Sequence, residues 1–255
     1  MRFFSSELGH EYTKTYTFGY CNYALLEKGD GSRELEEIYT RGYLPYTGSP
    51  QATGMFYMAR SGRVYLPSWD LDSECRRVAK KFENFTRETV PFKKFPVDTA
   101  WKQFWLDYFT RAHGSSVMTA ARLDFILDLG IISHVGVYKD AEGIARGYSL
   151  EVQTDTMTHD WFHAWDESLD QSSFGMYVLI DIGRAAKERG ASHYYCGTVY
   201  GNSNGASYKT NLPSLEYWAG GEWARDEKKL KEHLKSDKAR KIDLLDEWKE
   251  NRSLF

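Results

Sequence analysis

The stretch DWFHAWDESLDQSSFGMYVLIDIGRAAKERGASHYYCGTVY (Asp160–Tyr200) holds the order of elements that decides the fold. Its first residues are typical of a strand, and its last ten are typical of a buried strand. Between them, Tyr177, Ile180 and Ile182 form the apolar face of a helix that Gly190 is expected to end. A strand–helix–strand order predicts a right-handed crossover, with helices on one or both faces of a mixed sheet. The expected fold class is therefore α/β or α+β.

The segments on the N-terminal side of this stretch predict more elements of both kinds. We expect a strong helix from Asp98 or Thr99 to Gly114, followed by two strands over 131–153 that KDAEG joins. Further upstream, the pattern predicts a short helix over Ser32–Tyr43 and then a loop with Pro and Gly breakers over 44–54. A strand hairpin about RSG is expected over 55–67, and a basic helix from Ser73 onward.

Two prolines, Pro91 and Pro96, mark the expected domain boundary. It separates a small N-terminal α/β subdomain (1–95) from a second domain (96–255), whose charged tail after Trp223 is expected to form an exposed helix.

Composition narrows the class of protein. The net charge of −3 excludes a general polyanion binder, so contact with nucleic acid needs a local basic patch. Such a patch is expected between Arg76 and Lys94, where seven Lys or Arg stand against two Glu. The three cysteines are far apart, which makes a thiolate metal site unexpected and fits a reducing compartment. Since no long apolar run occurs, we expect a soluble, cytoplasmic protein with no membrane partner.

An ordered set of short motifs resembles the arginyl- and leucyl-tRNA–protein transferases. The matching residues run collinearly from about residue 18 to residue 223: SECRRVAKKF, Tyr108, Arg111, His113, Gly114, Met118, Asp166, Ser173, Gly175, Tyr177, Tyr195-Cys196-Gly197, Tyr208-Lys209, Leu215-Glu216-Tyr217 and Trp223. The resemblance implies a GNAT-like domain that transfers an aminoacyl group from aminoacyl-tRNA to a protein N-terminus. It implies aminoacyl-tRNA as co-substrate, no other cofactor and no DNA partner.

The chain also departs from that family. The family's N-terminal cysteine pairs are reduced to Cys21, so we expect no metal or iron–sulfur cluster. The basic residues before the family's Tyr-Lys pair are replaced by NGAS, and its Arg-Pro by LPS. The amino acid transferred and the acceptor therefore do not carry over.

The chemistry of aminoacyl transfer assigns expected roles to the candidate catalytic residues. A free α-amine has a pKa of about 7.7–8 and is partly neutral at pH 7, so only a modest base is needed. Asp166 is expected to bind the α-ammonium group or accept the acceptor's proton, and His163 to act as a base. Lys209 is expected to pair with a phosphate or carboxylate, and Tyr208 to bond the reacting centre or stack on an adenine.

Further residues are expected to bind the two substrates. The helix start at Ser173 and Gly175 can hold a phosphate or the terminal ribose. The basic face with Arg76, Arg77 and Lys80 can contact the tRNA backbone or an acidic acceptor. Tyr43, placed in a loop, is expected to line the acceptor pocket, and Glu216 to pair with Lys209 or contact an amine. Purely structural roles remain open: a plain capped helix, a packed imidazole at His163 and a solvated basic face.

Three other functions fit parts of the sequence. A tRNA-dependent enzyme could act on a small-molecule amine instead of a protein. An acyl-CoA-dependent GNAT N-acyltransferase would need a glycine-rich phosphate loop, whereas DQSSFGMY has one glycine. A non-enzymatic protein would have no reason to keep Asp166, Ser173, Tyr208 and Lys209 together.

Overall fold

The computed structural model describes residues 1–5, 22–26, 31–47, 53–169, 173–201 and 207–237. Cys21 lies outside these ranges. The chain divides into two compact units. Unit 1 comprises Met1–Tyr46, Gly54–Arg63 and Gly197–Phe255, and unit 2 comprises Thr47–Thr53 and Val64–Cys196. The predicted boundary between residues 95 and 96 cuts the chain once along the sequence, whereas each compact unit combines segments from separate parts of the chain. That boundary stays a prediction.

Unit 2 is built on a mixed sheet. Four strands pair antiparallel in sequence order: β6 (Thr86–Pro91), β7 (His134–Lys139), β8 (Ala145–Gln153) and β9 (Met157–Trp165). Helix α6 (Phe174–Glu188) then leads from β9 to β10 (His193–Thr198), which is parallel to β9. The expected strand–helix–strand order and the predicted α/β class, a mixed sheet with flanking helices, are confirmed.

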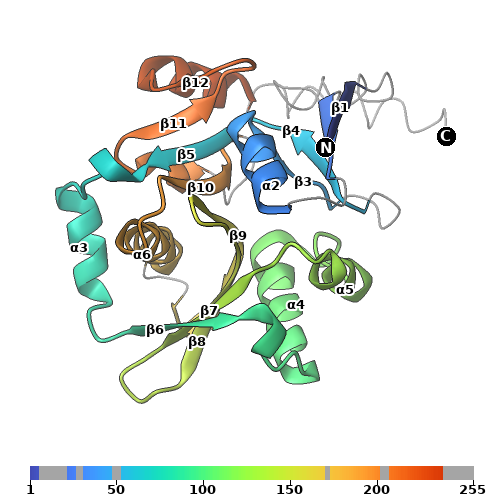
Figure 1. Ribbon diagram of the computed structural model, residues 1–255. Coiled ribbons are helices and arrows are strands. Elements are labelled where there is room, and N and C mark those ends of the chain that lie inside the picture. Colours follow the sequence, from blue (N-terminus) through green and yellow to red (C-terminus); the bar gives the residue numbers. More distant parts are fainter. Residues whose placement is uncertain (6–21, 27–30, 48–52, 170–172, 202–206, 238–255) are drawn as a thin grey trace, which may run out of the picture. The chain divides into compact units, whose positions relative to one another are not determined.

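Helices cover both faces of this sheet (Figure 1). Helices α4 (Thr99–His113) and α5 (Ala120–Asp128) bury an aromatic and aliphatic cluster, with Trp105 and Ile126 at its centre, against Val135 and Leu150. Helix α6 packs on β9 on the other face, beside α3 (Ser73–Lys81). Alternation of side chains along the strands explains this division, because Val135, Val137 and Leu150 point away from their neighbours Gly136 and Ser149.

Capping side chains fix the helix ends in unit 2. Asp98 accepts a hydrogen bond from Trp101 N at 2.8 Å, and Gly114 ends α4 with a φ of 94°, as expected. Helix α3 begins at Ser73, as expected, and Asp72 caps it by accepting a hydrogen bond from Cys75 N at 2.7 Å. Short 3₁₀ turns connect other elements: η2 (Leu66–Ser68), η3 (Phe92–Lys94) and η4 (Glu167–Leu169).

Unit 1 contains a four-stranded antiparallel sheet in the order β1-β2-β4-β3. The elements of unit 1, in chain order, are β1 (Arg2–Ser5), β2 (Asn22–Leu25), α2 (Gly31–Thr40), β3 (Tyr43–Pro45), β4 (Met55–Met58), η5 (Ser207–Asn211), β11 (Leu215–Trp218), β12 (Trp223–Ala224) and a helix over 227–237. The hairpin predicted over 55–67 is wrong: β4 pairs with β2 and β3, and not with β5 (Ser61–Tyr65).

A buried ion pair ties the last described helix to unit 1. Arg60 and Asp237 are 0% and 3% exposed, and Nη1 lies 2.7 Å from Oδ2. The same oxygen accepts a hydrogen bond from Gly201 N at 3.0 Å.

Within the ranges given above, no helix combines the length and apolar character that crossing a lipid bilayer requires.

Candidate active site

A β-bulge in β9 sets the geometry of the candidate site. Leu150 on β8 pairs with Phe162, but the next residue, Glu151, pairs with Asp160, so Trp161 is an extra residue in β9. An extra residue reverses the alternation of side chains beyond it. Asp160 and His163, which are three apart and would otherwise point to opposite faces, therefore share the face that α6 covers.

Asp160 and His163 form a close pair on this face. Nδ1 of His163 lies 2.6 Å from Oδ2 of Asp160. The side chain of His163 is 10% exposed and that of Asp160 is 1% exposed. Since an ionised carboxylate only accepts hydrogen bonds, Nδ1–H donates and Nε2 is the nitrogen that can take up a proton. A buried carboxylate that holds an imidazole in one tautomer is the arrangement of a general base. The imidazole also stacks on Trp165 at 5.6 Å.

The start of α6 lies next to this pair. Trp165 contacts Phe174, the first residue of α6, at 6.2 Å between ring centroids. Phe174 packs so closely over Gly147 that a Cβ on Gly147 would lie 2.8 Å from its ring. Parallel pairing of β9 with β10 ends at His159 and Tyr195, one residue before Asp160. The end of a strand that leads into a helix N-terminus is a position where open α/β sheets bind ligands.

Ser173 stands at the N-cap of α6 but differs from the expected cap. Its φ is 67°, in the left-handed region, and its side chain makes no capping hydrogen bond. No side-chain oxygen of Ser173 therefore satisfies the first N–H groups of α6. Gly175, the second residue of the helix, is buried. Ser172, the other cap considered, lies outside the described residues.

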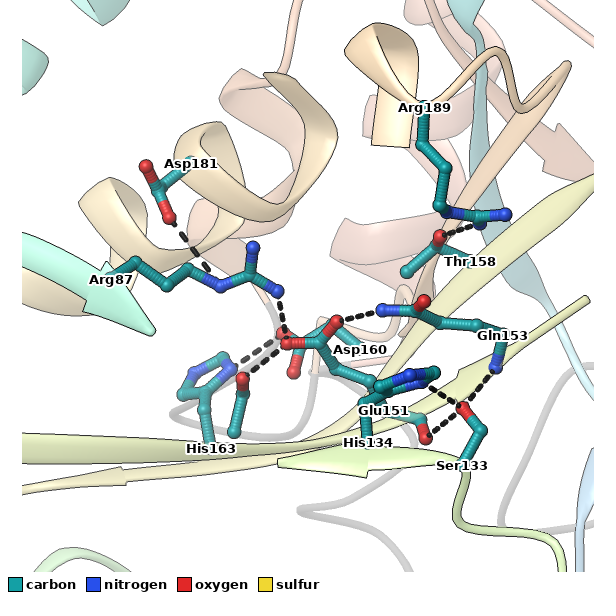
Figure 2. A network of polar contacts seen from close by, with 11 residues as sticks. Arg87, Ser133, His134, Glu151, Gln153, Thr158, Asp160, His163, Asp181 and Arg189 are labelled. Carbon is teal, nitrogen blue, oxygen red and sulfur yellow. Dashed lines mark hydrogen bonds and ion pairs between the residues drawn. The ribbon is translucent and has the colours of Figure 1, made fainter. Parts of the chain in front are cut away.

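A buried ionic network lies on the same face of the sheet (Figure 2). Arg87 on β6 places Nη2 2.6 Å from Oε1 of Glu151, whose side chain is 0% exposed. Ser149 and Gln153 donate to the two oxygens of Glu151 at 2.6 and 2.7 Å. On the other side of Arg87, Nε lies 3.6 Å from Oδ2 of Asp181 on α6. The hydrogen bonds from Arg87, Ser149 and Gln153 to Glu151 offset the cost of burying its charge, whereas Arg87 Nε is buried without a hydrogen bond.

Gly136 makes room for this network. A Cβ at this position would lie 2.3 Å from Ser149 Oγ, 2.9 Å from Glu151 Oε1 and 3.1 Å from Arg87 Nε. A side chain on the central strand β7 would therefore displace the three groups that meet above it.

Asp166 follows β9 and is paired rather than open. Its Oδ2 lies 3.3 Å from Nη1 of Arg146, whose Nε lies 2.6 Å from Oδ2 of Asp140. Burial opposes ionisation of Asp166, but hydrogen bonds from Ser168 and the charge of Arg146 outweigh it, so its pKa lies below the ordinary value. A lowered pKa suits binding of a cation and weakens Asp166 as a proton acceptor.

The three predicted cations of α3 lie on its exposed side. Arg77 pairs with Glu74 at 2.5 Å, and Arg76 donates to the Leu71 carbonyl. Lys80 lies at the edge of a pocket described below. Arg87 belongs to the same basic stretch of sequence, but its side chain is turned into the buried network.

The other four predicted residues lie in unit 1. Tyr43 is in strand β3 rather than in a loop, and it is 6% exposed. Tyr208 and Lys209 are half-buried in η5. Glu216 does not make the expected pair with Lys209: it accepts from Arg63 at 2.7 Å and from Arg225 at 2.9 Å. Trp223 stacks under Arg63 and donates to the Thr40 carbonyl at 2.7 Å.

Sequence reasoning missed Asp160, Glu151, Arg87 and Arg146. The bulge that aims Asp160 at His163 depends on the pairing of two strands, which no local pattern states. Glu151 offered a weak signal, because an acid between Leu150 and Val152 is unusual in a buried strand.

The residues that the structure describes contain no group of three or more His, Cys, Asp or Glu that could hold a metal ion. Burial, together with the hydrogen bond and charge of Asp72, raises the pKa of the Cys75 thiol to about 12. That thiol stays protonated at neutral pH and is a poor nucleophile.

Comparison with known proteins finds similarity over one segment. No protein-family model matches the chain. Over 70 residues it is 34% identical to the aspartate/glutamate leucyltransferases of Sinorhizobium medicae (strain WSM419) and Rhizobium meliloti (strain 1021), covering 28% of this chain and 26% of each relative. The match thus spans about a quarter of the relatives' length.

Several solved structures are similar to this chain at low identity. The L-PGS of Bacillus licheniformis is 12% identical with a TM-score of 0.44, covering 66% of this chain and 52% of that one. FemX is 11% identical with a TM-score of 0.41, covering 68% and 62%. A GCN5-related N-acetyltransferase from Sphaerobacter thermophilus is 12% identical with a TM-score of 0.32, covering 66% and 48%.

Proposed function

We propose that this protein is an aminoacyltransferase that moves an amino acid from aminoacyl-tRNA to the α-amine of a protein or peptide N-terminus. The observation that carries the proposal is the 34% identity over 70 residues with enzymes named for leucyl transfer. The Asp160–His163 pair beside the start of α6 supports it, because it supplies the base that the reaction needs.

The proposed step balances without any further cofactor. The neutral amine nitrogen attacks the carbonyl carbon of the aminoacyl ester, forming the new C–N bond. Nε2 of His163 takes the proton that this nitrogen loses, and Asp160 stabilises the imidazolium. The ester C–O bond then breaks, and the ribose oxygen leaves with a proton returned by His163. Holding amine and ester together can supply roughly 7–11 kcal/mol of the barrier reduction.

Residues in unit 2 would position the donor. The N-terminus of α6, at Ser173 and Gly175, suits a phosphate or the terminal ribose, because its N–H groups and helix dipole favour anions. Asp166, with its lowered pKa, suits the α-ammonium group of the aminoacyl moiety. The exposed cations Arg76, Arg77 and Lys80 suit the tRNA backbone.

Roles for the residues of unit 1 remain part of the proposal. Lys209 would pair with a phosphate or carboxylate, and Tyr208 would stack on a base or bond the reacting centre. Tyr43 would contribute to the acceptor pocket. The double pairing of Glu216 with Arg63 and Arg225 favours a structural role for it over direct contact with an amine.

The decisive experiment offers charged tRNAs carrying labelled amino acids to peptides that differ only at the N-terminal residue. Mass spectrometry that detects an added amino acid on a peptide supports the proposal and identifies donor and acceptor. Transfer to small amines but to no peptide would establish the small-molecule alternative. Absence of tRNA binding, with transfer from acyl-CoA, would overturn the proposal in favour of an N-acyltransferase.

A further inference from the structure

A concave pocket lies between α3, the start of β6 and α6. Its volume is about 550 Å³, which is within the range of small-ligand pockets (roughly 300–1,000 Å³). Asp181 and Arg87 lie at its floor, Phe85 and Tyr177 form its walls, and four charged residues surround its mouth: Lys80, Glu83, Arg184 and Glu188. None of these residues takes part in the step proposed above.

The charges at the floor do not balance. Arg87 carries one positive charge and faces two carboxylates, Glu151 at 2.6 Å and Asp181 at 3.6 Å. It makes its hydrogen bond to Glu151, which also accepts from Ser149 and Gln153, whereas Oδ2 of Asp181 is buried without a hydrogen bond. The excess negative charge therefore belongs to Asp181. The other oxygen of Asp181 points away from Arg87 (Figure 2).

Asp181 is also the floor group that a ligand can reach. Its side chain is 24% exposed, against 9% for Arg87. At the mouth, two cations and two anions cancel, and exposed charges are screened by salt within about 10 Å. The field inside the pocket is therefore set by the buried excess at Asp181, and it favours a cation.

The walls suit the apolar part of such a cation. Tyr177 stacks on Phe82 at 4.8 Å, and Phe85 lies edge-on to Tyr177 at 6.3 Å. Aromatic walls pack against methylene groups and attract ammonium groups through their faces. The anions Glu83 and Glu188 at the mouth can meet a second ammonium group, and Lys80 and Arg184 can meet a carboxylate.

We propose that this pocket binds a small alkylammonium ligand, a diamine or a basic amino acid, with the ammonium group on Asp181 and the methylene chain between Phe85 and Tyr177. The site is independent of the proposed transfer activity, so its failure would leave that activity untouched.

Isothermal titration calorimetry without tRNA tests the site directly. The probes are putrescine and lysine, with succinate as an anion of similar length and butanediol as its neutral counterpart. We expect saturable binding of putrescine or lysine, and none of succinate or butanediol. The two amines distinguish a diamine ligand from an amino acid.

Three variants assign the binding to this pocket. Asp181→Asn is expected to weaken amine binding at least tenfold. Ala185→Trp, at a half-buried position in the wall, is expected to abolish it by filling the pocket. Asp128→Asn, which removes an exposed carboxylate on α5, is the matched control and should bind normally. Unchanged affinity in folded Ala185→Trp, preference for succinate, or no amine binding would each overturn the proposal.

Discussion

His163 places Nδ1 2.6 Å from Oδ2 of Asp160 although the two residues are three positions apart on one strand. Residues at this spacing point to opposite faces of a regular strand, and the extra residue Trp161 brings them to the same face. The pair therefore depends on a local irregularity of β9 that re-aims one side chain toward another. Such bulges are over-represented next to active sites.

Asp160→Asn is expected to lower the rate of aminoacyl transfer by about 100- to 10,000-fold. An amide can donate to Nδ1 and favour the wrong tautomer, so Nε2 would no longer accept the acceptor's proton. The measurement is kcat for transfer to the best peptide, with melting temperature as a check on folding. His134→Gln, a change to another histidine on the same sheet, is the control and should keep normal kcat.

The same proton transfer predicts that the losses in kcat caused by changing Asp160 and His163 are not additive. His163→Gln should lower kcat about as much as Asp160→Asn, and the double variant should be little worse than either, because the two residues act as one unit. Independent, multiplying losses would argue that Asp160 has only a structural role.

Gly136→Ala is expected to lower the free energy of unfolding by roughly 1–3 kcal/mol. The new methyl group would meet Ser149, Glu151 and Arg87 at 2.3 to 3.1 Å, and the buried ionic network would have to shift. Urea denaturation measures the loss. Gly31→Ala, where no heavy atom lies within 4 Å of the new Cβ, is the control and should be nearly neutral. A loss equal to that of the control would show that the network can move at little cost.

Local patterns predicted most elements of unit 2 because each carries its own signal. Asp98 and Gly114 mark the ends of α4, KDAEG joins β7 to β8, and Gly190 follows the end of α6. The register of strands far apart in sequence carries no such signal. The hairpin predicted over 55–67 failed for this reason: β4 pairs with β2 and β3, which lie elsewhere in the chain.

The site could be predicted only in part. His163 and Asp166 were expected to be functional, but their partners were not, since Asp160 depends on the bulge and Arg146 comes from the neighbouring strand. The predicted pair of Glu216 with Lys209 was wrong, because Arg63 and Arg225 provide the cations for Glu216. Sequence separation hides partners that the sheet and the packing bring together.

The double change Arg76→Ala/Arg77→Ala is expected to weaken tRNA binding and to reduce its dependence on salt. Removing one cation that binds a phosphate lowers the slope of log affinity against log salt by about 0.7–0.9. The double change should therefore lower the slope by at most about twice this amount, and by less if Glu74 already neutralises Arg77. Filter binding over a series of salt concentrations measures the slope. Lys102→Ala, at an exposed cation on α4, is the control; an equal effect there would mean general charge attraction.

Asp181→Asn is expected to change stability in a pH-dependent way. Burial raises the pKa of Asp181 and the charge of Glu151 adds to it, while the charges of Arg87 and Arg184 oppose them incompletely. Because the folded pKa lies above the unfolded value of about 3.9, the folded protein binds this proton more tightly. The associated stability is fully present below the unfolded pKa and is lost as pH rises through the folded pKa.

Asparagine has no such proton to lose. The stability of Asp181→Asn relative to the natural chain should therefore increase from about pH 4 upward and level off above the folded pKa of Asp181. Urea denaturation at stepped pH measures this difference, and Asp128→Asn should show no comparable trend. A difference that decreases with pH would mean that ionised Asp181 stabilises the fold through Arg87. The excess negative charge inferred for the pocket floor would then be absent.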